Sequence, residues 1–194
     1  MTYFISDLHL GHKNVLQFDS RPFFTLEEMH ETIIRNWNQT VTDKDTVYLL
    51  GDVAWNDDIG YEIVKQLHGR KILILGNHDN RIDRTRGLFE RVTQMAEIKV
   101  NGEFVVLSHY PMSVWNRSFH GSVHLYGHVH NSKESEMVRK HHETMIAAGL
   151  KHECYNVGCM MPYMDYTPRT LEQIRALAVT PHVGAQVRKR WLRR

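Results

Sequence analysis

Side chains able to bind a metal follow five short apolar runs of this sequence. In chain order they are Asp7 and His9, Asp52, Asn77 with His78 and Asp79, His109, and His128 with His130. In open α/β sheets, ligands gather outside the carboxyl ends of the strands. Five such coincidences predict one shared site, because core packing alone gives no reason for polar side chains at these positions.

The spacing within two pairs of these residues constrains the backbone. Asp7 and His9 are two residues apart, and so are His128 and His130. On a helix such pairs would point about 200° apart, whereas in extended backbone they face the same way. Glycine stands just before a ligand-type residue at positions 51, 76 and 127, where it allows close backbone approach.

The chemistry of this ligand set favours a divalent metal. Carboxylate, imidazole and amide groups without a thiolate suit Mn, Fe or Zn. The set is larger than one four-coordinate site can use. It suits two metals about 3.5–4 Å apart that clamp a phosphoryl group between them.

Strands and helices alternate along the chain, which predicts a layered α/β fold. Thr25 and Glu28 form a capping box for a helix with an apolar stripe behind it. Asn101-Gly102 is a strong hairpin signal and indicates mixed sheets. Strands are expected at 3–6, 46–50, 71–75, 92–100, 103–107, 123–126 and 155–157, and further helices at 61–67, 132–149 and 170–177.

The composition is that of one globular domain spanning residues 1–194. Hydrophobic residues make up 42% of the chain and charged residues 24%. No run approaches the about 18 apolar residues of a membrane span, and the start of the chain does not have the pattern of a secretory signal. We therefore expect a cytoplasmic protein without a membrane partner.

The net charge of +2 is unevenly distributed. Residues 187–194 hold five Lys or Arg and no acid, so the rest of the chain carries 2 − 5 = −3. We interpret this basic C-terminal tail as a solvated chain end, with a nucleic-acid contact as the alternative.

The remaining histidines and the two cysteines give weaker signals. Five histidines are expected to be surface or structural residues: His120, His124, His141, His142 and His152. Cys154, Cys159 and either His141 or His142 could form a further zinc site, but their spacing fits no standard pattern.

The order of the short motifs over residues 7–130 resembles that of the calcineurin-like metallophosphoesterase superfamily. The motifs are Asp-x-His, Gly-Asp, Gly-Asn-His-Asp, His and Gly-His-x-His. The start Ser6-Asp7-Leu8-His9-Leu10-Gly11-His12-Lys13-Asn14 and the later Asn156-Val157-Gly158 resemble small single-domain bacterial and phage members. The resemblance implies a four-layer α-β-β-α sandwich of two mixed sheets, with the metal site at the C-terminal ends of strands.

The resemblance also implies a role for each residue. Asp7, His9, Asp52 and His130 would hold one metal, and Asp52, Asn77, His109 and His128 the other, so that Asp52 bridges them. His78 would not be a ligand and would face the phosphate.

One departure concerns the residues after Asp52. Larger phosphatases of the superfamily follow Gly-Asp with a further Asp and Arg, whereas Val53-Ala54-Trp55-Asn56 stands here. Candidate replacements for the acid are Asp79, Asp57 and Asp58, and candidate phosphate contacts are His12, Asn14, Arg81 and Arg84.

These features predict a two-metal phosphoester hydrolase. A hydroxide bridging the metals would attack phosphorus, and His78 would protonate the leaving group, with Asp79 as its catalytic partner.

Mn is the preferred ion, with Fe, Zn and Ni as alternatives. A phosphodiester of a small molecule or nucleotide is the preferred substrate. Alternatives are a phosphomonoesterase or nucleotidase, a nuclease, and a metal-bearing scaffold that binds a partner. The sequence does not indicate an oligomeric state.

Overall fold

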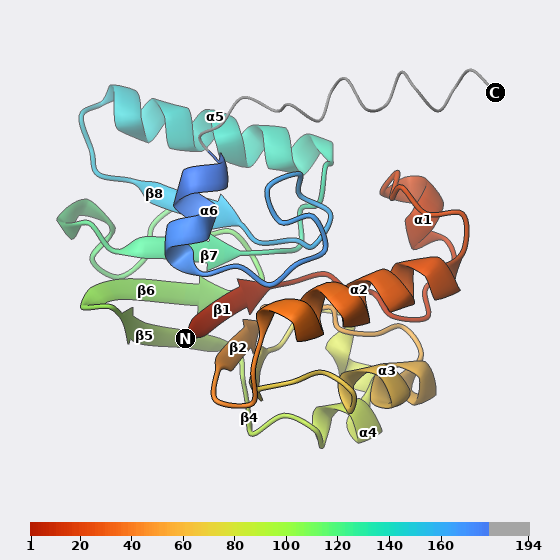
Figure 1. Ribbon diagram of the computed structural model, residues 1–194. Helices are drawn as coiled ribbons and strands as arrows, with labels where there is room; N and C mark the ends of the chain where they lie inside the picture. The colour runs from red at the N-terminus through yellow and green to blue at the C-terminus, as the bar shows by residue number, and fades with distance from the viewer. Residues whose placement is uncertain (179–194) are drawn as a thin grey trace.

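The computed structural model describes residues 1–178, and the predicted basic tail at 187–194 lies outside them. Two four-stranded sheets form a sandwich with helices on both sides (Figure 1). The first sheet contains β1 (Thr2–Ile5), β2 (Thr46–Leu49), β3 (Arg70–Ile74) and β4 (Arg91–Thr93) in that order. The second contains β5 (Met95–Val100), β6 (Glu103–Ser108), β7 (Val123–Tyr126) and β8 (Glu153–Asn156).

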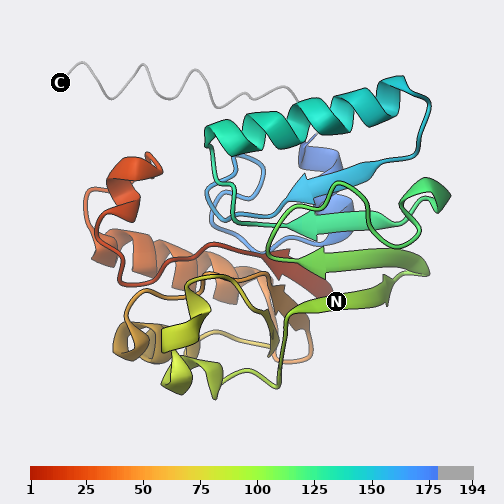
Figure 2. The same ribbon diagram turned by 180° about the vertical axis from the view of Figure 1, so that it is seen from behind.

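Helices flank both sheets, which agrees with the predicted layered α/β class. Helices α2 (Leu26–Thr40), α3 (Asp57–Val64) and α4 (Asp83–Arg86) lie on the side of the first sheet (Figure 1). Helices α5 (Lys133–Ala147) and α6 (Leu171–Ala178) lie on the side of the second, as the view from behind also shows (Figure 2). The short helices α1 (Val15–Phe18) and α4 and the 3₁₀ helices η1 (Asp79–Arg81) and η2 (Ser118–His120) were not predicted.

The sheets differ from the expectation in two respects. All strands of the first sheet are parallel, so only the second sheet is mixed, through the antiparallel β5–β6 hairpin at Asn101-Gly102. The segment 92–100, expected as one strand, contains parts of two, because β4 and β5 belong to different sheets. A continuous apolar pattern cannot reveal where a chain passes from one sheet to another.

Strand β1 joins the two sheets at their adjoining edges. It pairs with β2, and just beyond it the Ser6 backbone N–H donates to the Val157 carbonyl at 2.9 Å. The Cys159 N–H returns a 2.9 Å bond to the Ser6 carbonyl. Because β1 is covered on all sides, Phe4 and Ile5 have no exposed surface.

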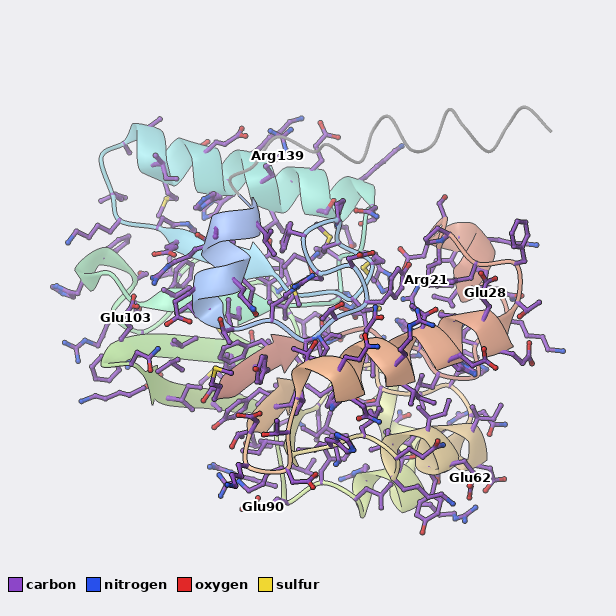
Figure 3. All side chains as sticks on the ribbon, viewed as in Figure 1. Arg21, Glu28, Glu62, Glu90, Glu103 and Arg139 are labelled. Atoms are coloured by element: carbon purple, nitrogen blue, oxygen red, sulfur yellow. The ribbon has the colours of Figure 1, made fainter. Side chains whose placement is uncertain are left out.

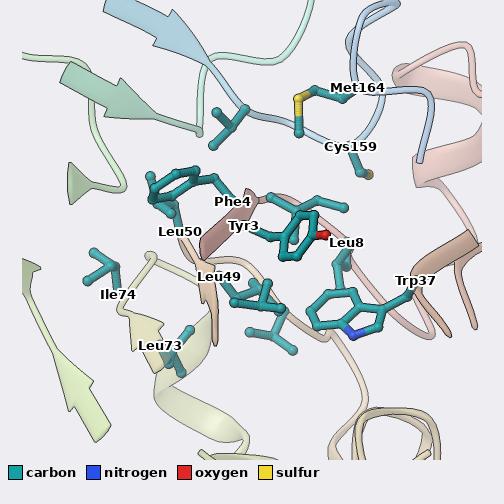
Figure 4. Close-up of a cluster of buried hydrophobic side chains, with 14 of the residues drawn as sticks. Tyr3, Phe4, Leu8, Trp37, Leu49, Leu50, Leu73, Ile74, Cys159 and Met164 are labelled. Atoms are coloured by element: carbon teal, nitrogen blue, oxygen red, sulfur yellow. The ribbon is translucent and has the colours of Figure 1, made fainter. Parts of the chain in front are cut away.

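The core lies around β1 and under α2. Tyr3 lies on the side of α2 and of Trp37, and Leu49 and Leu73 of the neighbouring strands are on that same face of the first sheet (Figure 4). Phe4 lies on the opposite face, as does Ile74. The capping box predicted for α2 is present in part. Thr25 Oγ1 accepts from the Glu28 N–H at 3.1 Å, whereas the Glu28 carboxylate accepts from Phe24 rather than Thr25.

Charged side chains mostly point outward. Glu62, Glu90 and Arg139 project from the ribbon, whereas Arg21 lies near α1 and α2 and is only 4% exposed (Figure 3). Among residues 1–178, no helix is both long enough and apolar enough to cross a membrane.

Candidate metal centre

The predicted ligands meet at the C-terminal ends of strands from both sheets. They follow β1, β2 and β3 of the first sheet and β6 and β7 of the second. Five of them have left-handed backbone, with φ between 45° and 71°: Asp7, His9, Asp52, His128 and His130. Non-glycine residues rarely adopt this conformation, and such strain concentrates at functional sites. The chain therefore turns sharply at these five ligands, and their side chains point toward one place.

Asp7, His9 and His130 form the first group, whose ligand atoms all lie within 4.8 Å of one another. His9 Nε2 and His130 Nε2 are 3.2 Å apart, and His130 Nε2 is 3.7 Å from Asp7 Oδ1. His9 is 3% exposed, and its Nδ1 has no hydrogen-bond partner among the described residues. Two facing imidazole nitrogens beside a buried carboxylate are an arrangement that a cation would stabilise.

Asp52, His109 and His128 form the second group under the same 4.8 Å limit. Asn77 belongs with it, because its Oδ1 lies 3.0 Å from His109 Nε2. The structure therefore brings together every residue predicted as a metal ligand.

Asp52 lies between the two groups. Its Oδ2 is 3.6 Å from His9 Nε2 in the first group and 3.5 Å from His109 Nε2 in the second. Its other oxygen, Oδ1, accepts the His78 backbone N–H at 3.0 Å. One carboxylate thus contacts both groups while the backbone fixes its orientation.

Acceptor groups outside the centre set the tautomers of two histidines. His109 Nδ1 lies 2.8 Å from the Leu50 carbonyl, which can only accept. His130 Nδ1 lies 3.1 Å from Asp19 Oδ2, at ion-pair distance although outside hydrogen-bond alignment. Both partners favour a proton on Nδ1, so each Nε2 lone pair faces the centre, as metal-binding histidines require.

A buried arginine supports this arrangement. Arg21 Nε donates to Asp19 Oδ2 at 2.9 Å, and its two terminal nitrogens donate to the Leu8 carbonyl at 3.0 Å and the Asp7 carbonyl at 2.7 Å. Arg21 therefore ties the Asp7 loop to the acid that contacts His130. Neither Asp19 nor Arg21 was predicted, because no motif spacing connects them with His130.

Asp79 occupies a different place from the one expected of a catalytic acid. Its carboxylate is fully buried and accepts three backbone N–H groups, from Asp52, Val53 and Gly76, at 2.8–2.9 Å. These bonds hold the two loops after β2 and β3 together. Its contacts are those of a residue that positions Asp52.

Burial shapes the protonation of the centre. Burial raises the pKa of Asp7 and lowers the pKa of His9 well below its usual range. Burial also lowers the pKa of His128. For His130, burial acts in the same direction, but the contact with Asp19 and the charge of Asp7 outweigh it and raise the pKa. A positive ion would favour the carboxylate and the neutral imidazoles together.

Two glycines allow the loops to approach this closely. A Cβ at Gly76 would lie 2.3 Å from Asp52 Oδ1, and one at Gly127 would lie 2.5 Å from Asp7 Oδ2. Neither contact is sterically possible, so both positions need glycine.

The outer edge of the centre carries His78 and three exposed aromatic side chains. The His78 side chain is 38% exposed, and its Nε2 is 4.0 Å from Asp52 Oδ2. Phe18, Trp55 and Tyr110, here called the aromatic rim, are 59%, 56% and 50% exposed. Their rings lie 5.9 Å from His130, 5.3 Å from His78 and 4.4 Å from His128, respectively. Beside His128 and His130, a cavity of about 250 Å³ reaches Phe18.

The predicted substrate contacts lie in different surroundings. His12 contacts Trp55 with ring centroids 4.3 Å apart and the rings tilted by 50°, which places it at the aromatic rim. Asn14 and Arg81 are exposed, and their contact with substrate stays a prediction.

Asp57, Asp58 and Arg84 have structural contacts with one another, away from the ligand groups. Asp57 accepts from the backbone N–H of Arg84, and the Arg84 guanidinium pairs with Asp58 and covers the Tyr61 ring. These contacts connect α3 with α4, so the three residues serve the packing of the two helices.

Comparison with known proteins places the chain in a family, and the names of the two relatives below state no activity. No family model matches it. It is 37% identical over 131 residues to the uncharacterized protein MJ1445 of Methanocaldococcus jannaschii, covering 66% of this chain and 68% of that protein. It is 30% identical over 166 residues to the Gene 66 protein of Mycobacterium phage L5, covering 67% and 77%. The chain belongs to the family of MJ1445 and this phage protein.

Solved structures support the fold of this MJ1445 family member. A protein of unknown function from Aquifex aeolicus, AQ665, aligns with a TM-score of 0.70 at 26% identity, over 91% of this chain and 98% of that one. YfcE, a phosphoesterase from E. coli, aligns over 66% of this chain and 69% of its own, with a TM-score of 0.41 at 17% identity. That similarity is too weak to carry an argument about activity.

Proposed function

We propose that this protein is a metal-dependent phosphoester hydrolase with two divalent ions, and that phosphodiesters are its preferred substrates. The observation that carries the proposal is the position of Asp52, whose Oδ2 lies within 3.6 Å of a histidine from each ligand group. When bound, the ions would lower the pKa of an attacking water and neutralise charge on the phosphate oxygens.

The assignment of ligands to ions follows the two groups. Asp7, His9 and His130 would hold one ion, Asn77, His109 and His128 the other, and Asp52 both. We propose Mn²⁺ as the working ion, because oxygen and nitrogen ligands without a thiolate suit it.

His78 is the proposed general acid. Its backbone N–H is fixed by Asp52 Oδ1, and its exposed ring stands at the edge where a leaving group would depart. Asp79 would act only indirectly, by holding the loops that carry Asp52 and His78.

The surroundings of the centre favour a diester over a monoester. A phosphomonoester dianion calls for cationic groups, but Arg21 is buried and directed at backbone carbonyls on the inner side. Beside His78, the groups that face solvent around the centre include the rings of the aromatic rim, which could stack on a base or another apolar ester substituent.

Metal dependence is the first test. Protein treated with a chelator should lose hydrolysis of bis(p-nitrophenyl) phosphate and recover it with Mn²⁺. Full hydrolysis by a preparation shown by elemental analysis to be metal-free would refute the proposal. If diester hydrolysis is absent but monoester hydrolysis requires Mn²⁺, the metal chemistry stands and the substrate class is wrong.

The role of His78 is tested with two leaving groups. We expect His78→Ala to keep its bound metals and to lose about 10²–10⁴-fold in kcat for a nucleoside leaving group, which needs a proton. The loss should be smaller for p-nitrophenolate, which leaves readily without one. Equal losses for both would assign His78 to positioning, and loss of metal would make it a ligand.

The aromatic rim is tested at Trp55. Stacking of a base on an aromatic ring contributes about 1–3 kcal/mol, so Trp55→Ala should raise KM for a dinucleotide by about 5–150-fold and change KM for a small alkyl diester little. Phe119→Ala is the matched control, because Phe119 is also exposed but lies in η2, which precedes β7 at the end of the strand opposite the centre. Equal effects of both variants would contradict a stacking role.

A further inference from the structure

A second cluster of ligand-type residues lies under α5, separate from the centre. His142 on α5, His152 just before β8 and Cys154 on β8 place their ligand atoms within 4.8 Å of one another. His142 Nδ1 is 3.0 Å from His152 Nδ1 and 3.7 Å from Cys154 Sγ. The other cysteine, Cys159, is elsewhere, with its Sγ 3.2 Å from the Asp7 carbonyl.

These distances fit one tetrahedral zinc ion. Zinc binds nitrogen at about 2.0–2.1 Å and sulfur at about 2.3 Å, so tetrahedral geometry separates two nitrogens by about 3.3 Å and a nitrogen from a sulfur by about 3.6 Å. The measured separations of 3.0 Å and 3.7 Å differ from these values by a few tenths of an ångström or less.

The surroundings orient His152 for metal binding. Its Nε2 lies 3.1 Å from the Ser113 carbonyl, which can only accept a hydrogen bond. The proton of the neutral ring is therefore on Nε2, and the Nδ1 lone pair faces His142 and Cys154. A carbonyl on the outer nitrogen of a histidine is the usual arrangement around a metal ligand.

A cavity adjoins the cluster on the side of α5. It has a volume of about 300 Å³, and its walls include His142, Cys154, Tyr126 and Tyr163. A three-residue site here would leave room for a water or another small ligand at a fourth position.

Helix α5 has an unusual attachment that a metal would explain. None of its 15 residues is buried, so few apolar contacts hold it on the second sheet. His142 is half-buried on its inner side, whereas His152 and Cys154 belong to the segment of β8. An ion bound by all three would connect the helix to the sheet.

We propose that His142, His152 and Cys154 form a zinc site that clamps α5 to β8. Imidazole and thiolate ligands favour zinc over the harder ions Mg²⁺ and Mn²⁺. Burial raises the pKa of the free Cys154 thiol to about 12, so binding would convert the thiol to the thiolate and release its proton to solvent. The site does not depend on the proposed hydrolase centre, which has no thiolate among its ligands.

Cobalt(II) is the probe, because it replaces zinc and gives a near-ultraviolet thiolate-to-metal charge-transfer band. We expect chelator-treated wild-type protein to develop this band with Co²⁺ and to lose it when Zn²⁺ is added. Cys154→Ser should abolish the band, and His142→Ala should weaken cobalt binding at this site at least tenfold. His141→Ala is the matched control, because His141 also contacts the Ser113 carbonyl, at 3.2 Å, but is outside the cluster.

Hydrogen exchange adds a second measurement. Zn²⁺ should slow amide exchange in α5 of the wild type and of His141→Ala, but not of Cys154→Ser. Circular dichroism checks that each variant is folded. If Cys154→Ser does not fold, His142→Ala, a change at a half-buried helix position, takes its place in both measurements. Absence of the band in the wild type at saturating Co²⁺, or its survival in folded Cys154→Ser, would overturn the proposal. Either result would leave the hydrolase proposal intact, since that is tested by diester turnover.

Discussion

Replacing Asp19 by Asn tests whether the acid behind His130 prepares it to bind metal. Asn keeps the size and one acceptor oxygen, so Arg21 can still donate to it as well as to the Leu8 and Asp7 carbonyls. The change removes the negative charge that lies 3.1 Å from His130 Nδ1. Without that charge, the proton is no longer held on Nδ1, and the Nε2 lone pair is less available to the centre.

The expected loss lies at the lower end of the range for such residues. Changing a residue that orients a metal ligand typically costs about 10–100-fold in affinity. Because Asn retains an acceptor and the contact is not aligned as a strong hydrogen bond, we expect about tenfold, or about 1.4 kcal/mol, for Mn²⁺. The loss should affect the ion held by His130 more than the ion held by His109, whose Nδ1 faces Leu50 instead.

Calorimetric titration of Mn²⁺ into chelator-treated protein measures both affinities. Asp58→Asn is the control, because Asp58 is an exposed acid that pairs with Arg84 away from the centre. Circular dichroism and thermal unfolding show whether each variant is folded. Affinity within twofold of wild type in a folded Asp19→Asn protein would refute the argument that Asp19 prepares His130.

Three further predictions concern the bridging carboxylate, a glycine beside Asp7 and a buried histidine. Asp52→Asn should weaken both ions together, because a neutral amide is a poor bridge between two dications; retention of two tightly bound ions after dialysis would contradict this. Gly127→Ala should lower the free energy of unfolding by about 1–3 kcal/mol and displace Asp7. Gly87→Ala is the control and should cost less, because its Cβ would meet nothing closer than 3.3 Å. Denaturant unfolding measures the free energy of unfolding of both variants. Burial lowers the pKa of His124 to about 4, so its neutral form is favoured on folding. This contribution to the free energy of unfolding is complete above the usual pKa of 6.5 and falls by about 3 kcal/mol as the pH drops to 4. Unfolding of chelator-treated protein at several pH values should show this fall in the wild type and not in His124→Gln.

Local sequence pattern determined the strands and the ligand types of this protein. An apolar run followed by a turn and a polar residue is a short-range signal, so strands can be located from it. Strand β7, for example, begins and ends where it was expected. The ligand types could be recognised because metal chemistry depends on side-chain groups, and the structure brings all seven predicted ligands together. The hairpin at Asn101-Gly102 was predictable for the same reason, since its turn depends on two adjacent residues.

Features that depend on contacts between distant segments could not be predicted. The sheet to which each strand belongs is one example, because the break at Gln94 between β4 and β5 has no marker in the pattern of apolar residues. The role of Asp79 is another. A carboxylate next to His78 in sequence suggested a catalytic pair, but the loop turns it inward onto the backbone of Asp52 and Val53.

The cluster under α5 shows the same division most clearly. The sequence offered zinc binding by Cys154, Cys159 and His141 or His142 only as an alternative to surface or structural roles for these histidines. It did not include His152 in that site. Which side chains meet depends on how α5 lies across β8, and that is a matter of packing between segments rather than of spacing along the chain. Residue types thus determined which chemistry was available to this protein, and the tertiary contacts decided which residues share a site, because a ligand set requires several side chains to converge within a few ångströms.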